Sequence, residues 1–279
     1  MTTVANLLKH ARIELAEFEE ATLEAEVLLC FCLNKTRTWL HTWPDKEISD
    51  TESLHFSKLV AQRIQGKPIA YITGTRDFWT FSLKVSDATL IPRADTETLV
   101  QAALDLIPQI VDWRIVDLGT GTGAIALAIA SERPECEVTG SDISAAALEI
   151  AQDNLDRYQL KNLKLIQSSW LENITGTFNL ILSNPPYIAE DDPHLNAGDL
   201  PWEPINALRA EKNGLADIET IMHQAYAQLK PGGWLLLEHG WQQKEAICEL
   251  FHQLKYTNIQ TIKDLAGLDR VSLAQKPTE

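Results

Sequence analysis

The feature that most constrains the fold is a repeated alternation of short strands, several of them apolar, and helical segments from Trp113 onward. Such short apolar runs are typical of strands that are buried on both faces. Repeated strand–helix units form a mainly parallel sheet, because each helix returns the chain to the same edge. The sequence therefore predicts an α/β fold with helices on both faces of the sheet. The expected strands span 114–118, 137–142, 163–166, 178–182, 234–238, 258–262 and 270–274.

The residues before about Gly74 have a different, helical pattern. Gly66 and Pro68 are stop signals at the end of the last helical segment of this region. Residues 77–85 then alternate with period two, which predicts a strand or hairpin. The apolar residues that recur at helical spacing are Leu8, Ala11, Leu15 and Phe18, then Leu23, Val27 and Phe31, and then Phe56, Val60 and Ile64.

Composition and charge exclude several classes of function. The chain has 24 Lys and Arg against 39 Asp and Glu, a formal net charge of −15, which argues against binding nucleic acid through phosphates. Four cysteines, at 30, 32, 136 and 248, form no C-x-x-C pair, so neither a metal site nor a disulfide framework is indicated. No apolar run approaches the ~18 residues of a membrane span, and no signal peptide is evident. We expect a cytoplasmic protein without membrane or direct nucleic-acid partners.

A glycine-rich turn, Asp117-Leu118-Gly119-Thr120-Gly121-Thr122-Gly123, follows the first predicted strand of the sheet. Ligands of open α/β sheets bind at the carboxyl ends of the strands, and glycines allow the backbone to approach them closely. Asp142 ends the next strand and can accept hydrogen bonds from both ribose hydroxyls. The pattern predicts a nucleoside cofactor. Because it also satisfies the dinucleotide fingerprint G-x-G-x-x-A, the turn by itself leaves NAD and other nucleosides open.

A second motif, Asn184-Pro185-Pro186-Tyr187, follows the strand at 178–182. The two prolines remove two backbone donors, so the carbonyls of Asn184 and Pro185 need other partners. The Asn184 side chain adds an acceptor, and Tyr187 offers a flat face to a planar group. Such a site can hold a planar NH₂ group by both of its hydrogens.

Together, these motifs resemble the class I S-adenosylmethionine-dependent methyltransferases that act on planar nitrogens. More closely, they resemble the protein-(glutamine-N(5)) methyltransferases of peptide chain release factors, the HemK/PrmC family. The resemblance implies a Rossmann-like domain over 91–279, whose mainly parallel seven-stranded sheet has an antiparallel last strand. It also implies a helical substrate-docking domain over 1–74 and a β-hairpin linker over 75–90. The segments that carry the resemblance are 66–74, 90–93, 95–97, 183–188, 203–204 and 236–240.

The resemblance also implies roles for individual residues. S-adenosyl-L-methionine, which becomes S-adenosyl-L-homocysteine, would be bound at its ribose by Asp142, at its adenine by Trp170, and near the methyl group by Asn184. The substrate would be the glutamine of the Gly-Gly-Gln loop of class I release factors. Asn184 and the Pro185 carbonyl would accept hydrogen bonds from its two N–H groups. Pro186 would lie beside them, and Tyr187 would pack on the amide plane. A monomer is expected. The residues implied to wrap the methionine part are Gly119, Thr120, Gly121, Thr122 and Gly123.

The sequence departs from the family pattern at two positions. Ala94 stands where a second proline is frequent, which loosens that loop. Ser169 replaces a frequent acid beside the adenine, so we expect weaker cofactor binding at most and the same class of activity.

Two other functions compete with this interpretation. An adenine amino-group methyltransferase of DNA or RNA shares Asn-Pro-Pro-Tyr, but the negative net charge counts against it. An NAD-dependent oxidoreductase would leave that motif without a role.

Other polar residues have weaker functional interpretations. Glu238 and His239, at the end of a strand, are expected to be structural, since the reaction needs no acid–base pair. Arg93, Asp95 and Glu97 either cap the neighbouring helix or line the mouth of the cofactor site.

Overall fold

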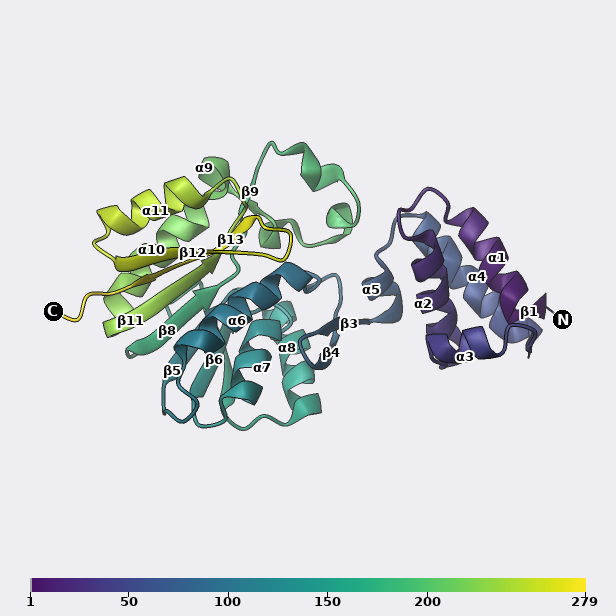
Figure 1. Cartoon of the computed structure of the whole chain (residues 1–279), viewed down its shortest axis with the longest axis horizontal. Coiled ribbons are helices and arrows are strands. Elements are labelled where there is room, and N and C mark those ends of the chain that lie inside the picture. Colours follow the sequence, from purple (N-terminus) through teal and green to yellow (C-terminus); the bar gives the residue numbers. More distant parts are fainter. Residues whose placement is uncertain (1) are drawn as a thin grey trace. The chain divides into compact units, whose positions relative to one another are not determined.

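The computed structural model describes residues 2–279 and separates into two compact units (Figure 1). The helical unit comprises the chain up to Thr75 together with residues 198–202. The sheet unit comprises residues 76–197 and 203–279. No helix within residues 2–279 combines the length and hydropathy that crossing a bilayer requires.

The helical unit packs its helices around a single apolar core. A reciprocal capping box between Ser49 and Glu52 begins its longest helix. Residues 198–202 are tied to this unit by Arg63, whose guanidinium binds Asp199 at 2.8 Å and Glu24 at 2.8 Å. Its elements are β1 (Thr2–Thr3) paired with β2 (Glu47–Ile48), and helices α1 (Val4–Glu14), α2 (Ala21–Leu33), α3 (Arg37–Thr42), α4 (Asp50–Ile64) and α5 (Ile69–Thr73).

The face that α2 buries differs from the one that the spacing of Leu23, Val27 and Phe31 suggests. Phe31 is 45% exposed, whereas the residues of α2 that are buried are Ala25, Glu26, Leu28 and Leu29. The reason is that most of α2 is apolar, so the sequence pattern selects no face, and packing against α1 and α4 selects it instead. Ile64 of α4 is likewise 49% exposed.

Glu26 is an acid within this core, and two arginines and a histidine beside it account for its burial. Its carboxylate binds Arg12 at 3.1 Å and Arg37 at 2.7 Å, with His41 at 3.6 Å. Burial by itself would raise the pKa of Glu26, but the hydrogen bond and charge of Arg37, with His41 and Arg12, hold it below its usual value.

The sheet unit is built on a seven-stranded sheet, which confirms the predicted fold class. Neighbouring strands are parallel except for β13, which is antiparallel to both of its neighbours. In the order in which they lie side by side, the strands are β12 (Thr257–Lys263), β13 (Asp269–Gln275), β11 (Leu229–Glu238), β8 (Phe178–Ser183), β5 (Arg114–Leu118), β6 (Glu137–Asp142) and β7 (Leu163–Gln167).

Helices cover both faces of this sheet (Figure 1). Alternate residues of a strand enter different cores: Leu180 and Leu182 of β8 face one, and Ile181 faces the other. One face is covered by α6 (Glu97–Leu106), α7 (Ala124–Glu132) and α8 (Ala145–Tyr158), and the other by α10 (Ala216–Gln228) and α11 (Lys244–Gln253).

Short elements complete the sheet unit. The predicted hairpin consists of β3 (Thr75–Phe78) paired with β4 (Phe81–Lys84). The remaining elements are η1 (Ala94–Thr96), β9 (Ile188–Ala189) paired with β10 (Arg209–Ala210), η2 (Pro193–Asn196), η3 (Leu200–Trp202, within the helical unit), η4 (Ile205–Ala207) and α9 (Glu211–Gly214).

The register of two neighbouring strands brings the two sequence motifs together. β5 and β8 are adjacent and parallel, with Leu118 opposite Ser183. The Ser183 hydroxyl donates to the Leu118 carbonyl at 2.7 Å, which fixes the strand ends against each other. The glycine turn leaves β5 after Leu118, and Asn184 follows β8, so both motifs begin at the same edge of the sheet.

Asn154 of α8 links the hairpin to the glycine turn. Its fully buried side chain accepts from the Lys84 N–H at 2.7 Å and donates to the carbonyls of Lys84 at 3.0 Å and Thr122 at 2.9 Å. We expect Asn154→Ala to lower the free energy of unfolding by about 3 kcal/mol, because it leaves buried backbone groups without partners. Urea denaturation measures this. Gln152→Ala, on the exposed side of the same helix, should change it by less than about 0.5 kcal/mol, and an equal loss in both variants would contradict the assignment.

Candidate functional site

A cavity of about 550 Å³ lies in the sheet unit beside the glycine turn and Asn184, within the usual size range of small-molecule sites. It brings most of the sequence-predicted site residues together. Gly123, Pro185 and Tyr187 are not on its wall, although each belongs to a motif that reaches it. The predicted residues that do line the cavity are Gly119, Thr120, Gly121, Thr122, Asp142, Trp170, Asn184 and Pro186.

The glycine turn has a backbone that residues with a Cβ rarely adopt. Gly119, Gly121 and Gly123 have φ values of +71°, +54° and +83°. A Cβ on Gly119 would lie 3.4 Å from the Cζ3 atom of Trp170, so this glycine also lets the indole approach the turn. The turn ends in α7, whose N-terminal N–H groups suit an anionic ligand group.

Asp142 shapes the turn as well as lining the cavity. Its Oδ2 accepts from the Gly121 N–H at 2.9 Å, and its Oδ1 accepts from the Ser144 N–H at 2.9 Å. Burial raises the pKa of Asp142, and these hydrogen bonds from Ser144 and Gly121 act against the rise. Each oxygen keeps a second lone pair with which to accept a ligand hydroxyl.

Asp117, at the end of β5, is a buried acid behind the turn. Its Oδ2 accepts from the Thr120 hydroxyl at 2.6 Å. Within residues 2–279, its Oδ1 is buried without a hydrogen-bond partner. Burial raises the pKa of Asp117 to about 7, despite the opposing hydrogen bond from Thr120.

The cavity wall includes one residue that is missing from the sequence-based prediction. Asp217, on α10, lines the cavity together with Trp170. Burial raises the pKa of Asp217, and the Trp170 side chain opposes the rise. No local pattern marks Asp217, because only the packing of α10 on the sheet brings it beside the turn. Other wall residues, Asn206, Ala207 and Arg209, adjoin the segment at 203–204 that carries part of the family resemblance.

The Asn-Pro-Pro-Tyr segment is fixed by side chains from other elements. The Asn184 Nδ2 atom donates to the Thr96 hydroxyl of η1 at 3.1 Å. The Tyr187 carbonyl accepts from Gln243 at 3.0 Å, and Pro185 is buried. Burial raises the pKa of Tyr187, so its hydroxyl is protonated at neutral pH. The bond to Thr96 leaves Oδ1 as the acceptor end of the Asn184 amide.

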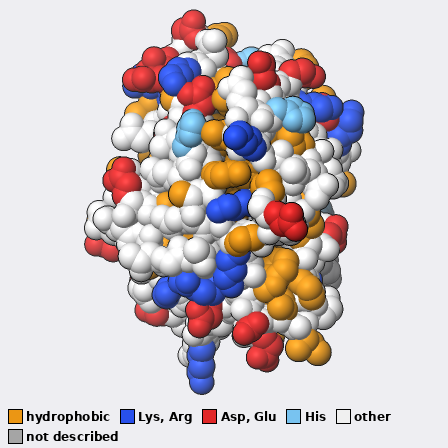
Figure 2. Space-filling model, turned by 90° about the vertical axis from the view of Figure 1, so that its left-hand side faces the viewer, with side chains coloured by type: hydrophobic (Ala, Val, Ile, Leu, Met, Phe, Trp, Pro, Cys, Tyr) orange, Lys and Arg blue, Asp and Glu red, His pale blue; other side chains and the backbone are white. Residues whose placement is uncertain are grey.

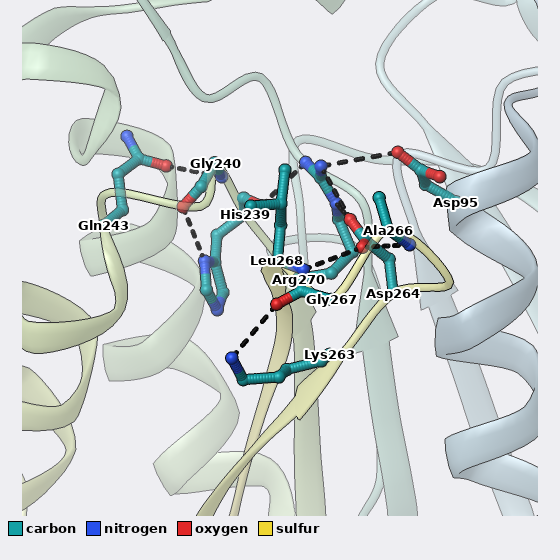
Figure 3. A network of polar contacts seen from close by, with 10 residues as sticks. All are labelled: Asp95, His239, Gly240, Gln243, Lys263, Asp264, Ala266, Gly267, Leu268 and Arg270. Atoms are coloured by element: carbon teal, nitrogen blue, oxygen red, sulfur yellow. Dashed lines mark hydrogen bonds and ion pairs between the residues drawn. The ribbon is translucent and has the colours of Figure 1, made fainter.

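Arg93, Asp95 and Glu97 make structural contacts and do not line the cavity. Arg93 pairs with Glu203, and Glu97 accepts from the Trp79 N–H at 2.9 Å. Asp95 lies 3.4 Å from the guanidinium of Arg270, which also binds Asp264 (Figure 3).

Glu238 ends β11 and His239 follows it, and neither is on the cavity wall. The His239 ring contacts the Gly240 carbonyl at 2.9 Å and the Ser272 hydroxyl at 2.8 Å. Burial lowers the pKa of His239, which favours a neutral ring. The imidazole is therefore engaged within the sheet, as expected of a structural residue.

The buried Asp117 should make stability depend on pH. Folding raises the pKa of Asp117 from 3.8 to about 7. The protonated acid therefore makes its full contribution to the free energy of unfolding below about pH 4, and this contribution is lost as the pH rises to about 7. Asp117→Asn removes this loss. The variant should therefore gain about 4 kcal/mol relative to the wild type between about pH 4 and pH 8. Urea denaturation at several pH values measures the difference, and a constant difference would contradict the assignment.

Comparison with known proteins agrees with this geometry. Residues 6–74 match the PrmC N-terminal domain, and residues 95–199 match the methyltransferase small domain. A release factor glutamine methyltransferase of Vibrio cholerae is 48% identical over 281 residues, which cover 99% of this chain and 98% of that protein. A protein of the same name from Escherichia coli is 44% identical over 269 residues, which cover 96% of this chain and 97% of that protein.

A solved structure has the same fold at lower identity. A methyltransferase from Pyrococcus furiosus superposes with a TM-score of 0.55 at 21% identity, covering 79% of this chain and 99% of that one.

Proposed function

The chain belongs to the release factor glutamine methyltransferase family, and we propose that it methylates the glutamine of the Gly-Gly-Gln motif of class I release factors with S-adenosylmethionine. The observation that carries the proposal is the meeting of the glycine turn and Asn184 on one cavity, set by the register of β5 and β8. Near full-length similarity to the curated relatives supports the substrate class.

The residues of the cavity fit S-adenosylmethionine. Asp142 would accept the ribose hydroxyls, and Trp170 would cover the adenine, with Asp217 on the same wall. The turn from Gly119 to Gly123 would wrap the methionine part, whose carboxylate suits the N-terminus of α7. The half-buried carboxylate of Asp142, on the cavity wall, favours the positive charge of this cofactor.

The reaction requires a weak nucleophile to be held in line with the methyl group. An amide nitrogen is a poor nucleophile, because its lone pair is delocalised into the carbonyl. When bound, the cofactor supplies a methyl group that is already activated by the sulfonium. Asn184 Oδ1 and the Pro185 carbonyl would accept the two substrate N–H groups and stabilise the positive charge that develops on nitrogen.

The positions of these residues suit a division of the site between two ligands. Asn184 and Pro186 are on the cavity wall, whereas Pro185 and Tyr187 lie beyond it in the same turn. The cofactor would occupy the cavity, and the substrate amide would lie at Asn184 between the cavity and Tyr187. Tyr187 would then pack on the amide plane.

The helical unit would dock the release factor, and the hairpin at 75–90 would link it to the methyltransferase domain at 91–279. The match of residues 6–74 to the PrmC N-terminal domain supports docking by the helical unit. Because release factors act in translation, we place the enzyme in the cytoplasm, and we propose that it works as a monomer.

The charge of this protein does not support the competing function, an adenine methyltransferase of DNA or RNA. On the face that Figure 2 shows, acidic and basic side chains are interspersed among apolar ones rather than separated into one basic surface. With a net charge of −15, the chain is poorly suited to bind a polynucleotide.

The decisive experiment incubates the protein with methyl-labelled S-adenosylmethionine and a class I release factor. Label should appear on the wild-type factor and be absent from a factor whose Gly-Gly-Gln glutamine is replaced by alanine. Equal labelling of both factors would disprove the proposed acceptor, and label on a DNA or RNA oligonucleotide would favour the alternative.

Asn184→Ala should reduce kcat on the order of 100-fold while changing the Kd for S-adenosylmethionine by less than about threefold. The reason is that the lost acceptor acts mainly as charge develops in the transition state. Single-turnover methyl transfer and calorimetric titration measure the two effects. Gln253→Ala, which removes an exposed carboxamide on α11, is the control. Loss of cofactor binding in step with kcat would contradict the role of Asn184.

A further inference from the structure

We propose that Glu203 is a positioning residue for the cofactor, because it fastens together two loop segments that form part of the cavity wall. The first segment, 90–93, leads into η1, and the second, 203–207, includes η4. Glu203 itself is not on the cavity wall. This inference rests on the proposed function, in which S-adenosylmethionine occupies this cavity.

Both segments contribute to the wall without belonging to the sheet. Leu90 and Pro92 line the cavity from the first segment, and residues 85–93 form no helix or strand. Pro204 and Ala207 line it from the second segment. The Ala207 N–H donates to the Pro204 carbonyl at 2.9 Å, a bond that stays within the second segment. A fixed wall therefore requires a link between the two segments.

The Glu203 carboxylate supplies this link. Its Oε2 accepts from the Ile91 N–H at 2.9 Å, and its Oε1 accepts from the Arg93 guanidinium. Both bonds involve an ionised group, and such bonds are stronger than those between neutral groups. One side chain thus holds the first segment at two points. We call this arrangement of Glu203, Ile91 and Arg93 the clamp.

The clamp grips the first segment between two residues of the cavity wall. Ile91 is 3% exposed and is not on the wall, whereas its neighbours Leu90 and Pro92 are. Pro92 and Pro204 have no N–H group, so neither can donate a backbone hydrogen bond across the two segments. The Ile91 N–H makes that bond instead. Any movement of Ile91 would move both of its neighbours, because they are bonded to it.

Burial makes the clamp costly to open. The side chain of Glu203 is 0% exposed, whereas that of Arg93 is 36% exposed. A buried carboxylate that loses its cation is strongly unfavourable, since water cannot take the place of the partner. The clamp therefore keeps the two segments in place before the cofactor enters. A wall that is already ordered lowers the entropy cost of binding.

Glu203→Gln tests the clamp with little change in shape. A carboxamide has one acceptor oxygen, so Gln cannot accept from both Ile91 and Arg93. The Kd for S-adenosylmethionine should rise about 10-fold, while kcat at saturating cofactor changes by less than about threefold. Calorimetric titration and single-turnover methyl transfer measure the two effects. Glu249→Gln, at an exposed carboxylate of α11, makes the same change in net charge and should alter neither.

Variants of Arg93 keep the proposal testable should Glu203→Gln fail to fold. Arg93→Met removes the cation and should raise the Kd for S-adenosylmethionine about 10-fold. Arg93→Lys restores a charged donor to Oε1 and should return the Kd to within about threefold of the wild type. Combining Glu203→Gln with Arg93→Met should raise the Kd by less than the product of the two single effects, because both variants break the same pair.

Two results would overturn the proposal. One is a Kd for S-adenosylmethionine within about threefold of the wild type in the folded Glu203→Gln or Arg93→Met protein, even if its thermal stability falls. The other is an equal rise of the Kd in Arg93→Met and Arg93→Lys. These titrations need no release factor. A wild-type protein that binds the cofactor but does not label release factor would instead refute the proposed function, so the two failures are distinguishable.

Discussion

The pairing of β5 with β8 is the interaction on which the site depends. Backbone hydrogen bonds hold Leu118 opposite Ser183, and the residues that follow each strand therefore emerge side by side. A slip of one residue would turn every side chain of a strand to the other face. The alternating burial of Leu180, Ile181 and Leu182 in two separate cores opposes such a slip. Core packing on both faces thus sets the distance between the glycine turn and Asn184.

Buried acids are the second constraint on this enzyme. Asp117 and Glu238 lie behind the two motifs, each with a pKa raised to about 7 by burial. Within residues 2–279 neither forms an ion pair, unlike Glu26 of the helical unit, whose carboxylate binds Arg12 and Arg37. The difference follows the role of each acid. Glu26 is compensated by its arginines, whereas Asp117 and Glu238 lower stability near neutral pH and lie behind the motifs that are proposed to bind ligands.

Much of the fold and part of the site could be predicted from the sequence. Strands such as 178–182 are evident because their apolar runs are short and bounded, and several of the seven predicted strands are followed by a helical segment, which indicates the sheet. The glycine turn and Asn-Pro-Pro-Tyr are local patterns, so a reader of the sequence finds them without knowing the packing. Their residue-level roles remain proposals, which the Asn184→Ala variant addresses.

The sequence by itself determined the α/β class, the helical N-terminal region and the two motifs, because each is encoded by neighbouring residues. Tertiary structure decided the buried face of α2, since that helix is apolar on most sides and its neighbours choose among its faces. It also decided the place of Asp217 on the same cavity wall as Trp170 and the contact of Thr96 with Asn184, which are 88 residues apart. Contacts of this kind carry no local signature: they exist only once the helices and strands have packed.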